Sequence, residues 1–214
     1  MFNIPSYKIR NNIRPVLSVM ASQHELPATA ALFNSARKMV FSAEVYSVYN
    51  MYDSEEYGIY IPSLWAGFVA SPNLSLFVQM GSGKMQDDNI TTFGPVLNFI
   101  WGQEAKETVL NIAINHLKGP DHFRVKDISM SLLKKVNLGD NRFVYGISPH
   151  YMNAKVKIKD RDIVGERNIN KTINETIYHY RAGFYRNINA IDLGVELNLS
   201  KNTLITKFNL VFII

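Results

Sequence analysis

The 214-residue chain contains no cysteine. Disulfides, thiolate chemistry and cysteine-based zinc sites are therefore excluded. The chain also has no run that approaches the roughly 18 consecutive apolar residues of a membrane-spanning helix. This excludes helical insertion into a membrane. It does not exclude a membrane β-barrel, because the apolar band of a barrel is spread over alternate residues.

Other signals are missing too. The N-terminal stretch MFNIPSYKIRNNIRP lacks the basic region followed by an apolar region that marks a signal peptide. His116, His122, His150 and His179 lie on separate segments without metal-ligand spacing, so we expect no metal site and no cofactor. The formal net charge is +5, but the densest basic stretch, residues 155–171, is interleaved with acidic residues. Nucleic acid is therefore not an expected partner.

The composition is that of a folded protein, with 47% hydrophobic and 19% charged residues. Short alternating segments are separated by turn residues at fairly even spacing, which predicts an antiparallel meander. The predicted strands are 13–21, 37–51, 57–70, 74–82, 92–101, 108–117, 123–136, 142–156, 174–187, 190–200 and 203–213, with a further strand within 2–9. A short helix within a loop is predicted for residues 26–36.

Two segments fit both a helix and a strand. Residues 104–117 place Leu110, Ala113, Ile114 and Leu117 at helical spacing, yet apolar and asparagine residues also alternate there. Residues 127–138 begin with a possible helix cap and also alternate. The clean alternation favours strands in both segments.

The C-terminal strands have two unlike faces. Large apolar residues occupy one face of the first strand, and polar or small residues occupy the other: Ile191, Leu193, Val195, Leu197 and Leu199 against Asp192, Gly194, Glu196 and Asn198. In a soluble barrel, Ile191, Leu193, Val195, Phe208 and Phe212 would line an apolar ligand cavity. In a membrane barrel the same apolar face contacts lipid and the polar face lines the lumen.

Three features favour the membrane barrel. The polar faces carry mostly short residues and glycines, which suits a narrow lumen better than a solvated sheet. Tyrosines and phenylalanines gather near predicted strand ends, as at a membrane interface. The longer, charged connections fall mostly on one side, at 53–57, 81–90, 118–122 and 157–173. Outer-membrane barrels have short periplasmic turns and longer outer loops in this way.

On these patterns the chain resembles bacterial outer-membrane β-barrel proteins. Such proteins typically end in an alternating apolar strand with an aromatic last residue. Here Phe208, Leu210, Phe212 and Ile214 keep the alternation, but the last residue is isoleucine. The resemblance covers nearly the whole chain and implies one all-β domain over residues 1–214, an up-and-down barrel of about 10–12 strands. It also implies a bacterial outer-membrane location and the lipid bilayer as a partner.

The expected site follows from the two faces. The predicted lumen-lining polar residues are Glu44, Asp127, Ser148, His150, His179, Arg181, Asp192, Glu196 and Lys207. The predicted lipid-facing residues are Leu193, Val195, Leu197, Phe208, Leu210 and Phe212. An open lumen would pass small polar solutes, with the charges tuning selectivity. A plugged lumen would make a structural barrel, with Glu196 paired to Lys207 across the hairpin.

A third function is a lipid hydrolase on the barrel wall. Ser148 and His150 share a strand face, and Glu175 and His179 share the same face of the next strand. A serine two residues from a histidine is common, and no spacing here matches a hydrolase motif. We therefore expect a non-enzymatic barrel without catalytic residues.

Overall fold

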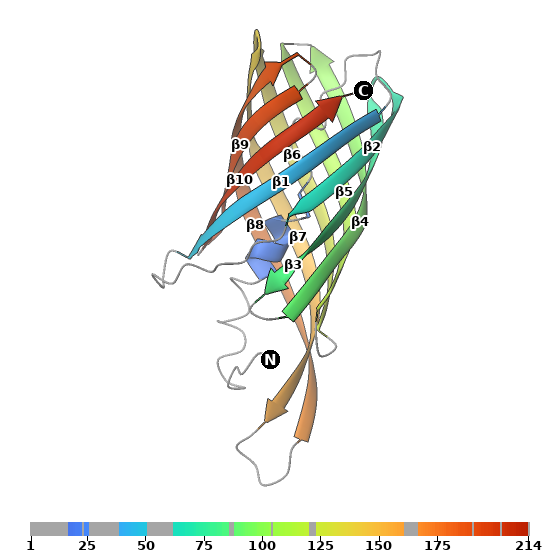
Figure 1. Cartoon of the computed structure of the whole chain (residues 1–214), viewed down its shortest axis with the longest axis vertical. Helices are drawn as coiled ribbons and strands as arrows, with labels where there is room; N and C mark the ends of the chain where they lie inside the picture. Colours follow the sequence, from blue (N-terminus) through green and yellow to red (C-terminus); the bar gives the residue numbers. More distant parts are fainter. Residues whose placement is uncertain are drawn as a thin grey trace.

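The computed structural model describes residues 17–22, 24–25, 39–50, 62–85, 88–103, 105–119, 123–160, 167–189, 191–201 and 203–213. The strands in these residues form one closed antiparallel barrel in which consecutive strands pair and β1 closes on β10 (Figure 1). They are β1 (Met39–Asn50), β2 (Ser63–Ser71), β3 (Leu74–Met85), β4 (Asp88–Gln103), β5 (Lys106–Lys118), β6 (Arg124–Leu138), β7 (Asn141–Asp160), β8 (Arg167–Ile188), β9 (Ile191–Leu199) and β10 (Thr203–Ile213). The predicted up-and-down barrel is confirmed, at the low end of the predicted strand number.

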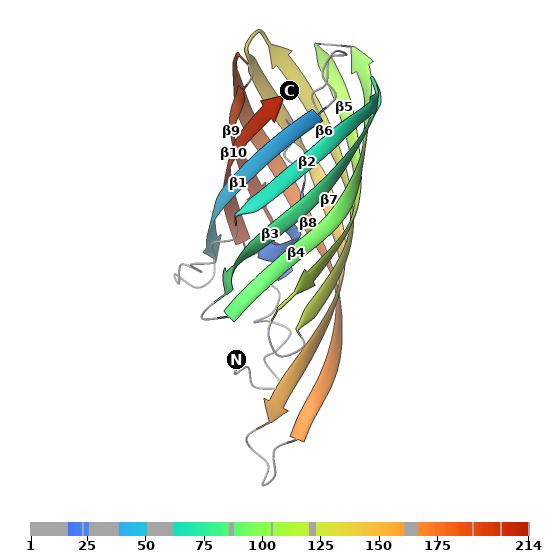
Figure 2. The same ribbon diagram turned by 45° about the vertical axis from the view of Figure 1, so that its right-hand side comes forward.

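The two ends of the barrel differ in their connections. At the end where β10 finishes, here called the turn end, the connections are 72–73, 104–105, 139–140 and 189–190. At the opposite end, called the loop end, they are 51–62, 86–87, 119–123, 161–166 and 200–202. The β7–β8 hairpin extends far beyond the rest of the wall at the loop end (Figure 2).

Alternation sets the inside and outside of the wall. Along β6, exposed and buried residues alternate from Arg124 to Lys135, and β5 follows the same rule over most of its length. The two ambiguous segments are therefore strands, as favoured. Their helix-compatible spacing is overridden because each strand buries one face inside the barrel.

The apolar face of the wall is the outer one. Leu193, Phe208 and Phe212 are exposed, while Asp192 and Lys207 beside them are buried inside. These apolar residues therefore do not line an interior cavity, which contradicts the soluble ligand-binding alternative. In the part of the chain that the structure describes, no helix combines the length and the apolar character needed to span a bilayer.

Small residues on the inner face make room for large ones. An added Cβ at Gly194 would lie 1.9 Å from Cδ1 of Tyr185, a side chain buried inside the barrel. Trp65 and Phe77 are also buried inside, near the turn end, whereas Phe68 faces outward. The glycines on the polar face thus accommodate aromatic rings that fill the interior.

One predicted strand is wrong. Residues 17–22, which overlap the predicted strand 13–21, form a short helix inside the barrel (Figure 1). Leu17, Val19 and Met20 are all buried in a cluster with wall residues near the loop end. Inside a closed barrel no strand edge is left to pair with, so this segment satisfies its backbone as a helix.

Other boundaries also move. The predicted loop 157–173 is mostly strand, because β7 runs to Asp160 and β8 starts at Arg167. Similarly, much of the predicted connection 81–90 belongs to β3 and β4. Charged residues were taken as loop signals there, but a hairpin outside the apolar band tolerates them. The predicted strand within 2–9 and the helix within 26–36 lie outside the described residues.

Candidate functional site: a segment anchored inside the barrel

Residues 17–22 and 24–25, here called the inner segment, lie inside the barrel toward the loop end (Figures 1 and 2). Ser18 and Ser22 are four residues apart, so they share one face of the helix. That face meets β8 and β9: Ser18 Oγ lies 3.0 Å from His179 Nε2, and Asn198 Nδ2 donates to Ser22 Oγ at 3.0 Å. The inner segment is therefore held to the wall by polar contacts as well as apolar packing.

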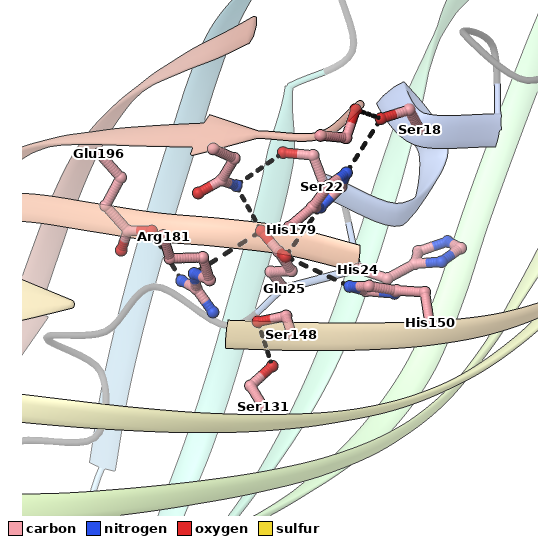
Figure 3. Close-up of polar contacts among 12 residues, drawn as sticks. Ser18, Ser22, His24, Glu25, Ser131, Ser148, His150, His179, Arg181 and Glu196 are labelled. Carbon is pink, nitrogen blue, oxygen red and sulfur yellow. Dashed lines mark hydrogen bonds and ion pairs between the residues drawn. The ribbon is translucent and has the colours of Figure 1, made fainter. Parts of the chain in front are cut away.

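Glu25 is the centre of these contacts (Figure 3). Its Oε1 accepts from His179 Nδ1 at 2.9 Å and from His150 Nε2 at 3.2 Å. Its Oε2 lies 3.4 Å from Lys207 Nζ and 3.7 Å from Arg181 Nε. One carboxylate of the inner segment thus contacts charged or polar side chains of β7, β8 and β10.

The surroundings keep Glu25 ionised. Burial by itself raises the pKa of a carboxyl group. Arg181, His179 and Lys207, together with the hydrogen bond from His150, outweigh this and hold the pKa of Glu25 well below its usual range. Lys207 also donates to the Ser22 carbonyl oxygen. A charged Glu25 and these basic groups therefore stabilise one another in a buried place.

A second carboxylate continues the network. Asp127 Oδ2 accepts from Nδ1 of His150 and from Nδ1 of His24, each at 2.9 Å. Nε2 of His24 lies 2.9 Å from Thr92 Oγ1. Because a carboxylate only accepts, both nitrogens of His150 must donate, one to Asp127 and one to Glu25. His150 is then an imidazolium that bridges the wall and the inner segment.

The histidine of β8 completes a three-residue relay. When His179 is neutral and donates Nδ1–H to Glu25, its Nε2 accepts the hydroxyl proton of Ser18. Ser18 Oγ also lies 2.7 Å from Ser200 Oγ. All four side chains are buried. A hydroxyl, an imidazole and a carboxylate in this order can move a proton from the serine toward the histidine.

Ion pairs also join residues within the wall. Arg181 Nη2 donates to Glu196 Oε2 at 2.6 Å, although Glu196 is directly opposite Lys207 in the β9–β10 register. Near the turn end, Asp192 accepts from Arg142 at 2.5 Å and from Asn187 at 2.6 Å. The observed partner of Glu196 is therefore Arg181, whereas Lys207 turns to the inner segment.

The predicted lumen-lining residues are all buried inside the barrel wall: Glu44, Asp127, Ser148, His150, His179, Arg181, Asp192, Glu196 and Lys207. Ser148 does not meet His150, because its hydroxyl donates to Ser131 Oγ at 2.7 Å. Of the predicted lipid-facing residues, Leu193, Val195, Leu197, Phe208 and Phe212 are exposed on the outer face, and Leu210 is half-buried there. Their roles in function stay predictions.

Glu25, His150 and His179 could also act as metal ligands. Each offers one ligand atom, and these atoms lie within 4.8 Å of one another. Asp127 behind His150 resembles the carboxylate that often orients a metal-bound histidine. However, Lys207 and Arg181 already face the same Glu25 carboxylate, and their charges oppose a bound cation. The arrangement suits an ionic network better than a metal site.

The sequence interpretation missed the inner segment altogether. Ser18, Ser22, His24 and Glu25 were not predicted as site residues. The available signal was a dense polar series, Ser-x-x-x-Ser-x-His-Glu, with two serines at helical spacing. Alternation of Leu17 and Val19 hid it, because two apolar residues at this spacing also fit a strand.

Comparison with known proteins shows the fold. No family model matches the sequence, and no curated protein matches it. The translocator domain of the autotransporter NalP from Neisseria meningitidis is similar in structure, with a TM-score of 0.57 and 9% identity over 94% of this chain and 97% of that chain. The β domain of the Bordetella autotransporter BrkA reaches 0.49, with 7% identity over 84% of this chain and 99% of that chain. An outer-membrane channel from Pseudomonas putida F1 reaches 0.47, with 7% identity, 89% of this chain and 100% of that chain covered.

The likeness to NalP spans nearly both chains, and identity this low informs on the fold alone. It agrees with the closed antiparallel wall and with the apolar outer face. The chain has the fold of the outer-membrane β-barrel proteins.

Proposed function

We propose that residues 1–214 form one barrel domain in a bacterial outer membrane. The barrel passes small polar solutes when the inner segment detaches from the wall. At rest the barrel is closed. The apolar outer face supports the membrane location, because in water it would expose a large continuous apolar surface. The short connections at the turn end and the longer ones at the loop end support a periplasmic turn end.

The observation that carries this proposal is the attachment of the inner segment through Glu25. The carboxylate meets His150, His179, Lys207 and Arg181, which all belong to the wall. The strands are joined to one another by their own ladder of backbone hydrogen bonds. Loss of the Glu25 contacts therefore weakens the attachment of the inner segment without opening the wall.

The wall behind the inner segment is suited to water. Inward residues along the middle strands include Asn98, Asn111, Asn115, Ser129 and Ser131, all buried. Both side-chain polar atoms of Asn111 are buried without a hydrogen-bond partner among the described residues. Buried polar groups of this kind gain hydrogen bonds when water enters. A polar lining supports passage of polar rather than apolar solutes.

Planar-bilayer recordings test the proposal. The wild-type protein should show little steady conductance, and Glu25→Ala should open discrete ion-conducting events. Asp192→Asn is the matched control, because it also removes a buried carboxylate but breaks only wall–wall contacts with Arg142 and Asn187. It should remain closed. If Glu25→Ala folds as a barrel but never conducts, the protein is a closed structural barrel.

A disulfide sharpens this test, since the natural chain has no cysteine. The hydroxyl oxygens of Ser18 and Ser200 lie 2.7 Å apart, which places the two side chains near bonding distance for a disulfide. In the Glu25→Ala background, Ser18→Cys with Ser200→Cys should block conductance under oxidising conditions. A reductant should restore it. If conductance is the same under oxidising and reducing conditions, the solute path does not pass the inner segment.

The relay of Ser18, His179 and Glu25 favours a second function, an acyl hydrolase. In that reaction the Ser18 oxygen attacks an ester carbonyl while His179 accepts its proton and passes it to the leaving alcohol. Water, deprotonated by His179, then releases the acid and restores Ser18. Diisopropyl fluorophosphate should then add a diisopropylphosphoryl group to Ser18, with loss of fluoride. The adduct should be absent in Ser18→Ala and His179→Asn, and no adduct in wild-type protein would exclude this function.

A further inference from the structure

A group of basic side chains lies on the outer face of β5, β6 and β7 near the loop end. Lys118, Arg124, Lys126 and Lys155, together with His116, surround a hollow of about 620 Å³. All five side chains are exposed. We call this group the basic patch. It lies on the opposite side of the wall from the inner segment network, so the proposed passage does not use it.

The strand register places like charges next to one another. Lys118 is directly opposite Arg124, and Arg124 is directly opposite Lys155. In the adjacent row, His116 is opposite Lys126. Like charges facing each other across a sheet destabilise it. No carboxylate lines the hollow, and in the described part of the chain none of these four cations makes an ion pair. An external anion would relieve this repulsion.

The surroundings of the basic patch are amphipathic. Phe93 is exposed in the same hollow. One step further toward the middle of the strands, the outward residues are Ile114, Ile128 and Tyr151, which are exposed on the apolar band. The basic patch therefore sits where the apolar band meets the loop end, from which the β7–β8 hairpin projects (Figure 2).

We propose that the basic patch binds the phosphorylated headgroup of a lipid in the leaflet at the loop end. A phosphate can accept from the guanidinium fork of Arg124 and from both flanking lysines at once. Basic pockets at membrane interfaces hold anionic lipid headgroups in this way. Phe93, Ile114 and Ile128 would lie beside the acyl chains of such a lipid. This argues for a lipid rather than free phosphate. The proposal rests on the membrane placement proposed above, but not on conductance.

Titration of the folded protein in an uncharged detergent tests it. The probes are dioctanoyl phosphatidic acid, dioctanoyl phosphatidylcholine and inorganic phosphate, with retained lipid counted by native mass spectrometry. Phosphatidic acid should bind saturably, and binding should weaken with salt. The triple change Lys118→Gln, Arg124→Gln and Lys155→Gln should weaken it on the order of 100-fold, given the usual contribution of each cation near an anionic surface.

The matched control removes three exposed, outward basic residues near the turn end: Lys106→Gln, Lys134→Gln and Arg186→Gln. It has the same net charge as the triple variant and should bind phosphatidic acid like wild type. Equal weakening in both variants would mean only a general charge effect, and inorganic phosphate binding as tightly as the lipid would mean a free-anion site. Either result overturns the proposal. Conductance is measured separately, so a failed passage would leave this test intact. A protein that is monodisperse without detergent would instead overturn the membrane placement.

Discussion

A charge placed in the middle of the outer face should show whether that face contacts lipid. Met130 is 52% exposed and lies midway between Lys126 and Lys134 on the outer face of β6. Those two lysines are eight residues apart, which is about 27 Å along a strand at roughly 3.4 Å per residue. With a tilt of about 40° the apolar stretch between them is about 21 Å tall, close to the roughly 25 Å band of membrane barrels. Met130 therefore lies near the middle of the band.

Met130→Arg should cost about 2–4 kcal/mol, because the charge enters the middle of the hydrocarbon. Leu138→Arg, at the turn end of the same strand, should cost about 0–1 kcal/mol. Both changes in the free energy of unfolding can be measured by urea titration of the protein in lipid vesicles. Gel mobility with and without heating reports the folded fraction at each urea concentration. If the outer face contacts water instead, Met130→Arg should cost almost nothing, since an exposed methionine replaced by arginine changes stability by less than about 0.5 kcal/mol. A stable Met130→Arg protein would refute the lipid-facing assignment.

Three further outcomes follow from the interior. Gly194→Ala should destabilise the barrel by about 1–3 kcal/mol in urea titrations, because the added Cβ clashes with the buried ring of Tyr185. Gly139→Asn should not destabilise it, because nothing lies within 4 Å of that turn position and asparagine tolerates its positive φ; equal losses of stability in the two variants would show that the ring can move aside. The lowered pKa of Glu25 stabilises the closed state above pH 4.5, and this stability is lost as the pH falls below 4.5 toward the pKa of Glu25 in the folded protein. Conductance should therefore rise only in acid, and a rise between pH 6 and 8 would mean that another titratable group controls opening. Arg181→Met should cost about 3–5 kcal/mol, because it removes the buried ion pair between Arg181 and Glu196, and adding Glu196→Gln should recover part of the loss. Strictly additive costs would mean that the two side chains act independently.

Most of the fold could be predicted from the alternation of apolar and polar residues in the sequence, because a closed wall with one apolar face imposes a period of two on every strand. The closing strands show this best: the range predicted for β10 matches Thr203–Ile213, and β9 differs by one residue at each end. The charged ends of β7 and β8 were missed for a physical reason. Outside the membrane a hairpin needs no apolar face, so the alternation that marks a strand disappears there while the backbone pairing continues.

The candidate site could be predicted only in part. The wall residues His150, His179, Arg181 and Lys207 were identified, since a charged residue on the polar face of a membrane barrel must point inward. Their partner Glu25 was not. It lies in a segment whose position depends on packing against β8, β9 and β10, and contacts more than 150 residues apart in sequence, such as Glu25 with His179, leave no local pattern.

The charges inside the barrel explain why the inner segment and the wall depend on each other. Lys207 is fully buried and contacts the inner segment, at the Ser22 carbonyl oxygen and at Glu25. A buried ammonium group without a carboxylate or carbonyl partner costs several kcal/mol. An empty lumen must therefore take up water to solvate Lys207 and the side of Arg181 that faces Glu25, although Arg181 keeps its ion pair with Glu196. Closure by the inner segment and a hydrated lumen are thus two ways of satisfying the same cations, and a dry, empty barrel is excluded as a stable state.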